Sequence, residues 1–156
     1  MSDDLSWKGN TEAITKRAFT RMIILRNLFQ FEVPLEDLLE IYILYIRSVV
    51  EQSAVVWSSS ISKGEQKDIE RVQKVALRII FKDNYSSYTE ALKLSGLESL
   101  SARRGKLCLN FAKKCTKSEQ TSQMFPINIP AVDTRNPETF YVTPARTERF
   151  LKCKDL

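Results

Sequence analysis

The sequence predicts an all-α protein, a bundle of about five helices followed by an extended, proline-containing C-terminal tail. Its 156 residues are 43% hydrophobic, which is enough to bury a core, and they include only four Gly. Apolar residues recur at helical spacing over the first 117 residues. Four of the five Pro follow residue 118, where no helical period persists. We therefore expect a linker segment at 1–9, one helical domain at 10–117 and a tail at 118–156.

The first predicted helix runs from about Asn10 to Phe29, with Asn10 or Thr11 as its N-cap. Apolar residues three and four positions apart predict one buried face on this helix. That face comprises Ile14, Ala18, Met22, Leu25 and either Leu28 or Phe29.

The second predicted helix starts near Pro34 and continues to about Ser53. Proline suits the first turn of a helix, and Glu36 and Asp37 suit its positive end. Residues 41–46 are apolar on every side, which predicts the central and most buried helix. We expect one common core to contain Ile43, Leu44, Val72, Ile79 and Leu107.

The third predicted helix spans about Lys63–Lys82 and follows a turn through Ser58–Ser60. Ser62 and Glu65 have the spacing of a capping box. Six basic residues recur every three or four positions, within an arc of roughly 100° on a helix. This basic stripe consists of Lys63, Lys67, Arg71, Lys74, Arg78 and Lys82. The opposite arc is apolar: Ile69, Val72, Val75, Ala76, Ile79 and Ile80.

The fourth predicted helix is short, with Ser87 and Glu90 as a second capping box and Gly96 as its end. The fifth helix begins after Ser99 and ends near Lys117. Its expected buried side is Leu100, Leu107, Phe111 and Cys115. Its expected solvent side is Arg103, Arg104, Lys106, Lys113 and Lys114. In the tail, a brief strand is possible at 140–142.

The net charge of +5 is unevenly placed along the chain. Residues 1–60 hold six basic and eight acidic side chains, and residues 118–156 hold five of each. Residues 61–117 hold thirteen basic and six acidic side chains, so all the excess positive charge lies there. This distribution favours a polyanionic partner, with nucleic acid first and an acidic protein second.

Two interpretations of the basic stripe remain open. A row of cations opposite an apolar face is most often a solvated helix surface. Asp68 and Glu70 lie off the stripe, however, and an uninterrupted row of cations suits a phosphate backbone. Arg103 and Arg104 form a second candidate contact, because a bound phosphate would offset their unfavourable place in the first turn of a helix.

Three aromatic residues are weaker candidates for stacking on bases. Trp57 follows an apolar run, so a packed ring whose indole N–H caps a turn is the favoured interpretation. Tyr85 and Tyr88 lie between two basic helices and are mainly expected to be structural.

Several classes of chemistry are excluded by composition. The chain has no His, its three Cys form no metal-binding pattern, and four scattered Gly make no phosphate-binding loop. The only adjacent carboxylates, Asp3 and Asp4, have the context of a solvated loop. We expect no catalytic residue, metal, cofactor, small-molecule substrate or membrane span. Reduced cysteines and an N-terminus without a signal peptide predict an intracellular protein, in the cytoplasm, the nucleus or both.

The residues from Val49 to Phe111 resemble the region after the polymerase domain in non-LTR (LINE-type, jockey-like) retrotransposon reverse transcriptases. The resemblance is carried by Glu51, by VVWS around Trp57 and by IERVQKVALRII at 69–80. It continues through YSSY at 85–88 and EALKLSGLESLSARRGKLCLNFAKK at 90–114. Residues 2–28 are similar to the family's passage from palm to thumb, and 143–150 resemble the family's closing tail.

The resemblance implies a helical thumb and following helices, with the catalytic palm expected before Met1. Such a module would contact the parent palm and grip an RNA/DNA template–primer duplex by its backbone, without catalysis of its own. The chain departs from the family pattern at Ser48, Gln52, Ser59 or Ser60, Ser101 and Ala102, which indicates a diverged or decaying copy. Two alternatives stay open: a helical protein-interaction module, and a decayed transposon fragment without independent function.

Overall fold

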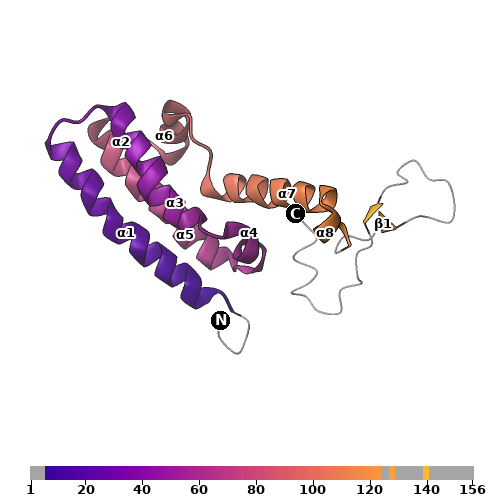
Figure 1. Ribbon diagram of the computed structural model, residues 1–156. Coiled ribbons are helices and arrows are strands. Elements are labelled where there is room, and N and C mark those ends of the chain that lie inside the picture. The colour runs from indigo at the N-terminus through magenta and orange to yellow at the C-terminus, as the bar shows by residue number, and fades with distance from the viewer. Residues whose placement is uncertain (1–5, 124–126, 129–138, 141–156) are drawn as a thin grey trace. The chain divides into compact units, whose positions relative to one another are not determined.

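The fold is all-α, as the sequence predicts. The computed structural model describes residues 6–123, 127–128 and 139–140, with side chains for 6–123 (Figure 1). Its long helices are α1 (Lys8–Gln30), α5 (Lys63–Phe81) and α7 (Leu100–Lys117). The shorter elements are α2 (Leu35–Ile41), η1 (Tyr42–Arg47), α3 (Ser48–Glu51), α4 (Ala54–Trp57), η2 (Ser58–Ser60), η3 (Lys82–Asn84), α6 (Tyr88–Ser95), α8 (Glu119–Ser122), β1 (Ile127–Asn128) and β2 (Thr139–Phe140).

Contacts divide the chain into two units, Met1–Lys106 and Leu107–Leu156. The expected division lay after residue 117, whereas the observed one falls inside α7. The first half of this helix belongs to the bundle because Leu100 is fully buried there. In the second unit, α8 was not expected from the sequence, and β1 and β2 pair antiparallel with Ile127 opposite Phe140.

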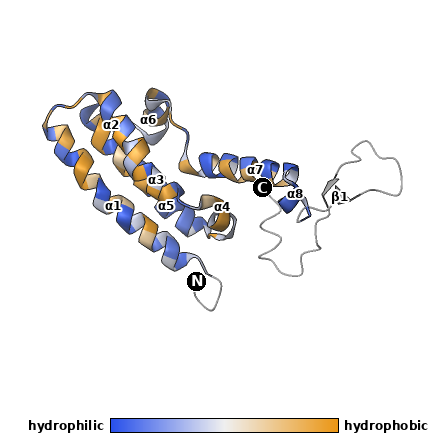
Figure 2. Ribbon diagram, viewed as in Figure 1, coloured by the Kyte–Doolittle hydropathy of each residue, from blue (hydrophilic) through white to orange (hydrophobic). Residues whose placement is uncertain are grey.

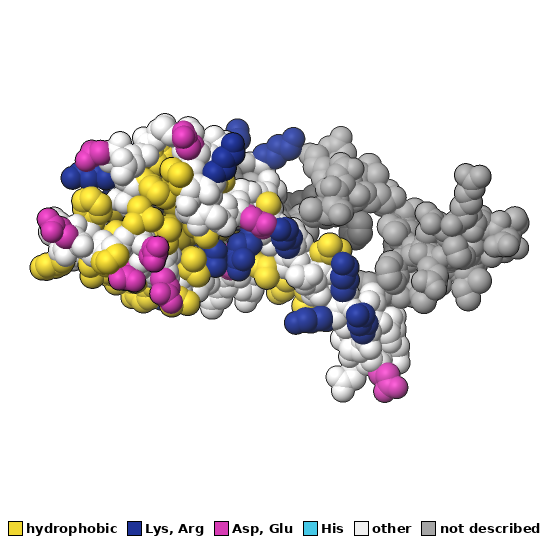
Figure 3. Space-filling view, turned by 90° about the horizontal axis from the view of Figure 1, so that it is seen from above, with side chains coloured by type: hydrophobic (Ala, Val, Ile, Leu, Met, Phe, Trp, Pro, Cys, Tyr) yellow, Lys and Arg dark blue, Asp and Glu magenta, His cyan; other side chains and the backbone are white. Residues whose placement is uncertain are grey.

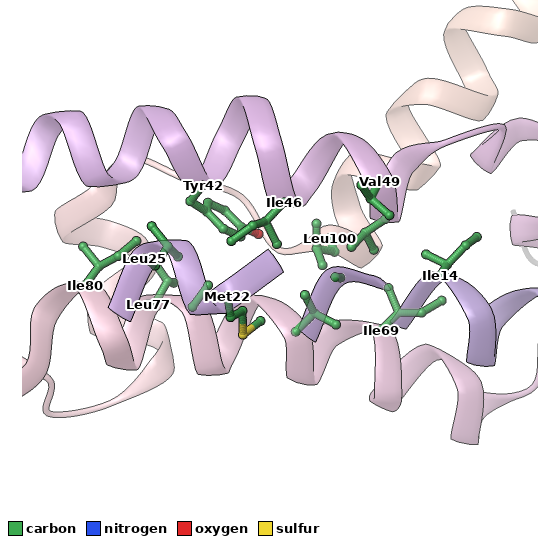
Figure 4. Close-up of a cluster of buried hydrophobic side chains, with 14 of the residues drawn as sticks. Ile14, Met22, Leu25, Tyr42, Ile46, Val49, Ile69, Leu77, Ile80 and Leu100 are labelled. Carbon is green, nitrogen blue, oxygen red and sulfur yellow. The ribbon is translucent and has the colours of Figure 1, made fainter. Parts of the chain in front are cut away.

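In the first unit, α1, the α2–η1–α3 segment and α5 lie side by side, and each has a hydrophobic and a hydrophilic side (Figures 1 and 2). Their hydrophobic sides meet in one core, drawn in Figure 4. Its fully buried members come from α1, η1, α3, α4, α5 and α7, and they include Ile14, Met22, Leu25, Tyr42, Ile46, Ile69, Leu77 and Leu100. The buried face predicted for α1 is confirmed at Ile14, Ala18, Met22 and Leu25.

The predicted cap of α1 is wrong. The helix begins at Lys8, and Trp7 precedes it without a side-chain capping hydrogen bond. Thr11 is instead buried inside the helix, where its hydroxyl oxygen lies 2.9 Å from the Lys8 carbonyl oxygen. The sequence missed this because the partner of Thr11, described below, lies on another helix.

The second predicted helix is apolar on every side at residues 41–46, but it is not buried on every side. Tyr42 and Ile46 are fully buried, but Leu44 is 66% exposed and Ile43 only half-buried. Tyr42 and Ile46 face the core, so Leu44, midway between them, lies on the opposite side of the helix and the expectation for Leu44 fails. Residues Tyr42–Arg47 form a π-helix, in which each N–H bonds the carbonyl five residues back.

The remaining core predictions have mixed outcomes. Val72 is fully buried, and Ile79 packs against the core while half-buried. Leu107 is half-buried and belongs to the second unit, so it does not share this core. Phe111 is 52% exposed, although Cys115 is buried as expected.

Three features named from the sequence lie outside the described residues. They are Asp3 with Asp4, the segment 143–150 and most of the rest of the tail.

Candidate nucleic-acid interface

Helix α5 starts at the capping box that the sequence predicts. The Glu65 backbone N–H donates to the Ser62 hydroxyl at 3.2 Å, and the Ser62 N–H donates to the Glu65 carboxylate at 2.8 Å. The same carboxylate accepts a hydrogen bond from the Thr11 hydroxyl at 3.0 Å, which ties α5 to α1. Partial burial opposes ionisation of Glu65, but the hydrogen bonds from Ser62 and Thr11 outweigh it and lower the pKa of this carboxyl.

The buried side of α5 determines which side of the helix, and so which basic side chains, face solvent. Seven residues of the helix are buried: Ile69, Val72, Gln73, Ala76, Leu77, Ile80 and Phe81. Three of them, Gln73, Leu77 and Phe81, do not belong to the apolar arc that the sequence predicts. The Gln73 amide donates to the Glu98 carbonyl at 2.9 Å, so its partner is a backbone group 25 residues away that helical periodicity cannot reveal.

All six members of the basic stripe are exposed, as predicted: Lys63, Lys67, Arg71, Lys74, Arg78 and Lys82. Within the described part of the chain, no carboxylate lies within 4.0 Å of any of these cations. With a rise of 1.5 Å per residue, the stripe runs for roughly 28 Å. It therefore presents a row of uncompensated positive charge on one side of the bundle.

Aromatic rings, rather than carboxylates, lie beside half of the stripe. The Lys74 ammonium lies 5.1 Å from the centroid of the Tyr88 ring, and the Arg78 guanidinium lies 5.3 Å from that of Tyr85. The Lys82 ammonium lies 5.1 Å from the centroid of Phe29. Such contacts hold a cation by about 0.5–1 kcal/mol at exposed sites without neutralising it.

Glu70, the acidic residue beside the stripe, is engaged with α7. Its carboxylate accepts from the Leu100 and Ser101 backbone N–H groups, both at 3.1 Å, and from the Tyr88 hydroxyl. It thereby caps a helix N-terminus, where a negative charge is favourable. Burial, followed by the bond to Glu70, raises the pKa of Tyr88 above the ordinary range.

The second predicted contact, Arg103 with Arg104, does not share the exposure of the stripe. Arg103 donates two hydrogen bonds to the Glu51 carboxylate, one of them at 3.2 Å from Nη2. These bonds raise its pKa, and Arg47 approaches the same carboxylate at 4.0 Å. The guanidinium of Arg104 lies 6.0 Å from the Trp57 ring centroid.

The expectation that Arg104 faces solvent is wrong, because its side chain is only 2% exposed. Its neighbour Arg103 is half-buried and held by Glu51. Since Glu70 caps the start of α7, the helix end that was to receive a phosphate holds a carboxylate of the chain itself. We therefore restrict the candidate interface to the α5 stripe.

Trp57 is a packed residue, as the favoured interpretation states. It is 1% exposed, and its indole N–H donates to the Gln52 carbonyl at 2.9 Å. This bond closes the turn between α3 and α4, where Ser53 adopts a φ of 53°. Tyr85 and Tyr88 are half-buried beside stripe cations, so neither ring is an open platform for a base.

Comparison of the chain with known protein families, with curated proteins and with solved structures finds no match. In the described residues, no group of three His, Cys, Asp or Glu side chains could hold a metal ion. No helix in this part of the chain combines the length and apolarity needed to cross a bilayer.

Proposed function

We propose that this chain is a non-catalytic helical module that binds duplex nucleic acid through backbone phosphates. The observation that carries the proposal is the α5 stripe of six exposed cations with no described carboxylate within 4.0 Å. Each strand of a duplex carries one phosphate per about 3.4 Å of helix axis. A 28 Å stripe parallel to this axis therefore runs alongside about eight phosphates of one strand. Because the strand curves away from a straight helix, three or four of these phosphates are within reach of the cations.

The resemblance to the thumb region of non-LTR reverse transcriptases supports the same function. The residues that carry it are also the residues that build the bundle behind the stripe. Glu51 holds Arg103, Glu70 caps α7, and Trp57 closes the turn between α3 and α4. A thumb of this kind would grip an RNA/DNA template–primer duplex, with the palm of the parent polymerase supplying the chemistry.

The test is binding to an RNA–DNA hybrid, measured by fluorescence anisotropy at several salt concentrations. With three or four phosphate contacts, log K should fall with log salt with a slope of about −3 to −4. The double substitution Arg71→Glu with Lys74→Glu should weaken binding to every sequence alike and flatten the slope by about two units.

The matched control is Lys16→Glu with Arg17→Glu, which makes the same change in charge at two exposed residues of α1. Its effect on affinity should be clearly smaller than that of the stripe variant. If both variants weakened binding equally, or if neither did, the stripe would be an ordinary solvated helix face.

A protein-interaction module is the second candidate, and a specific surface favours it. Figure 3 shows hydrophobic side chains gathered over the bundle, with acidic side chains around them. Phe31 and Leu44 are 77% and 66% exposed, and Glu36 and Asp37 stand in the first turn of α2. This function would be favoured by a protein partner whose affinity does not depend on salt or on the stripe substitutions. The substitution Leu44→Asp should then abolish binding of that partner.

A decayed fragment is the third candidate. The exposed apolar residues of the bundle would then lack the surface that normally covers them, and the purified chain would aggregate. A monodisperse chain with cooperative unfolding would argue against this candidate.

A further inference from the structure

The C-terminal end of the basic stripe forms part of the wall of a groove. The groove, of about 830 Å³, lies where α1 and α5 both reach their C-terminal ends. The residues on its wall that concern us are Arg26, Phe29, Glu32, Arg78, Ile79 and Lys82. Two stripe cations are thus joined by a third, Arg26, from a different helix.

Two residues of the groove have a backbone conformation that L-residues rarely adopt. Lys82 ends α5 with φ 41° and ψ −107°, and Glu32 follows α1 with φ 52°. Helix α6 ends at Gly96 with φ 64°, where glycine carries no such penalty. A residue other than glycine is strained at a positive φ. Both residues end or follow a helix, and both line the groove.

The groove carries more positive charge than its own groups neutralise. Arg26, Arg78 and Lys82 face a single carboxylate, Glu32, and no described ion pair joins Glu32 to any of the three. The two helix C-termini add about half a negative charge each, which leaves the groove positive. Phe29 and Ile79 supply an apolar wall beside these charges.

We propose that this groove binds the terminal phosphate of a nucleic-acid strand, an assignment that rests on the function proposed above. A terminal phosphomonoester carries about −1.5 to −2 charges at pH 7, whereas an internal phosphodiester carries one. Three cations on the wall of one groove fit the doubly charged group better. The guanidinium groups of Arg26 and Arg78 can each donate two parallel hydrogen bonds to it. The apolar wall then meets the sugar and base of the terminal nucleotide.

The test compares two RNA–DNA hybrids that differ only in a phosphate or a hydroxyl at one strand end, with 5′ and 3′ ends examined separately. The wild-type chain should prefer one phosphorylated hybrid by about tenfold. Lys82→Gly should reduce this preference to within twofold. Because glycine relieves the strained φ, the melting temperature of this variant should not fall, and lost binding cannot then be ascribed to unfolding.

Two matched variants sharpen the result. Lys63→Ala removes a cation from the other end of the stripe, so it should weaken both hybrids equally and leave the preference unchanged. Glu32→Gln removes the only carboxylate of the groove wall, so it should strengthen the preference. A preference that persists in Lys82→Gly, or its absence in the wild-type chain, would overturn the assignment.

The outcomes separate this proposal from the proposed function. Salt-dependent binding of both hybrids without preference refutes the groove assignment and leaves the stripe intact. Failure to bind either hybrid refutes both. Inorganic phosphate should compete for the groove only far above the concentration of the hybrid. If it abolished the preference at equal concentration, the groove would be a site for free phosphate and not for a strand end.

Discussion

The bundle holds two groups of cations that look alike in sequence and differ in structure. The α5 stripe is exposed and faces no described carboxylate within 4.0 Å. Arg103 is bound by Glu51, and Arg104 is 2% exposed beside Trp57. The first group can act on a partner, whereas the second is held within the bundle, Arg103 by Glu51 and Arg104 by burial. A count of basic residues therefore overstates the charge that a partner meets.

The largest expected effect is on the free energy of unfolding, and it follows from removing the negative charge of Glu51, which binds Arg103 of the second group. Glu51→Gln leaves Arg47 and Arg103 close together without an anion. Loss of a buried partner costs about 3–5 kcal/mol, and partial exposure of Arg103 reduces this to about 2–3 kcal/mol. Urea unfolding measures the change. As a control, Glu12→Gln breaks the exposed pair with Lys8 and should cost less than about 0.5 kcal/mol. Equal costs would mean that Arg103 is not held as described.

Glu70→Gln tests the cap that occupies the start of α7. The neutral amide keeps one acceptor oxygen for Leu100 or Ser101, but its NH2 group cannot accept from the other N–H, and the charge that strengthens these bonds is lost. We expect a loss of about 1–2 kcal/mol of unfolding free energy. Hydrogen exchange should become faster first at the N–H groups of Leu100 and Ser101. Unchanged protection there would argue against this cap.

Glu65 gives the bundle a pH dependence at the start of the stripe. Because the folded state lowers its pKa, its charge stabilises the fold above the ordinary value near 4.5, and this contribution disappears as the pH falls through the lowered folded value. Glu65→Gln should cost about 1 kcal/mol at pH 7 and progressively less as the pH falls below the ordinary value of 4.5. Unfolding curves of both proteins across this range measure the difference. A difference that does not change with pH would mean that the hydrogen bonds from Ser62 and Thr11 do not favour the ionised carboxylate.

The smallest expected effect is that of Arg104→Met on binding. A buried guanidinium contacts no phosphate, so the slope of log K against log salt should stay within about 0.3 of the wild-type value. Replacing one exposed stripe cation, as in Lys67→Met, should flatten the slope by about one unit. If Arg104→Met flattened the slope as much as Lys67→Met, Arg104 would contact a phosphate, and the two groups of cations would not differ in their access to a partner.

The difference between the two groups also explains what the sequence could predict. The Ser62 capping box, the exposed side of α5 and the end of α6 at Gly96 depend on residues within four positions of each other. Those predictions are confirmed. Arg103 lies 52 positions from Glu51, and nothing in the local pattern of α7 marks that pairing. Leu44 was misplaced because residues 41–46 are all apolar, and such a run does not mark which side of the helix faces the core.

The π-helix at Tyr42–Arg47 has a consequence for insertions and deletions in the gene. A π-turn holds one residue more than the corresponding α-helical turn, and the exposed Leu44 lies within it. Loss of the Leu44 codon would convert this segment to a regular α-helix and leave the residues on either side facing the core. Loss of a codon in the middle of α5 would rotate the rest of that helix by about 100° and turn its cations toward the core. Single-codon deletions should therefore persist in the first segment and be eliminated from the second.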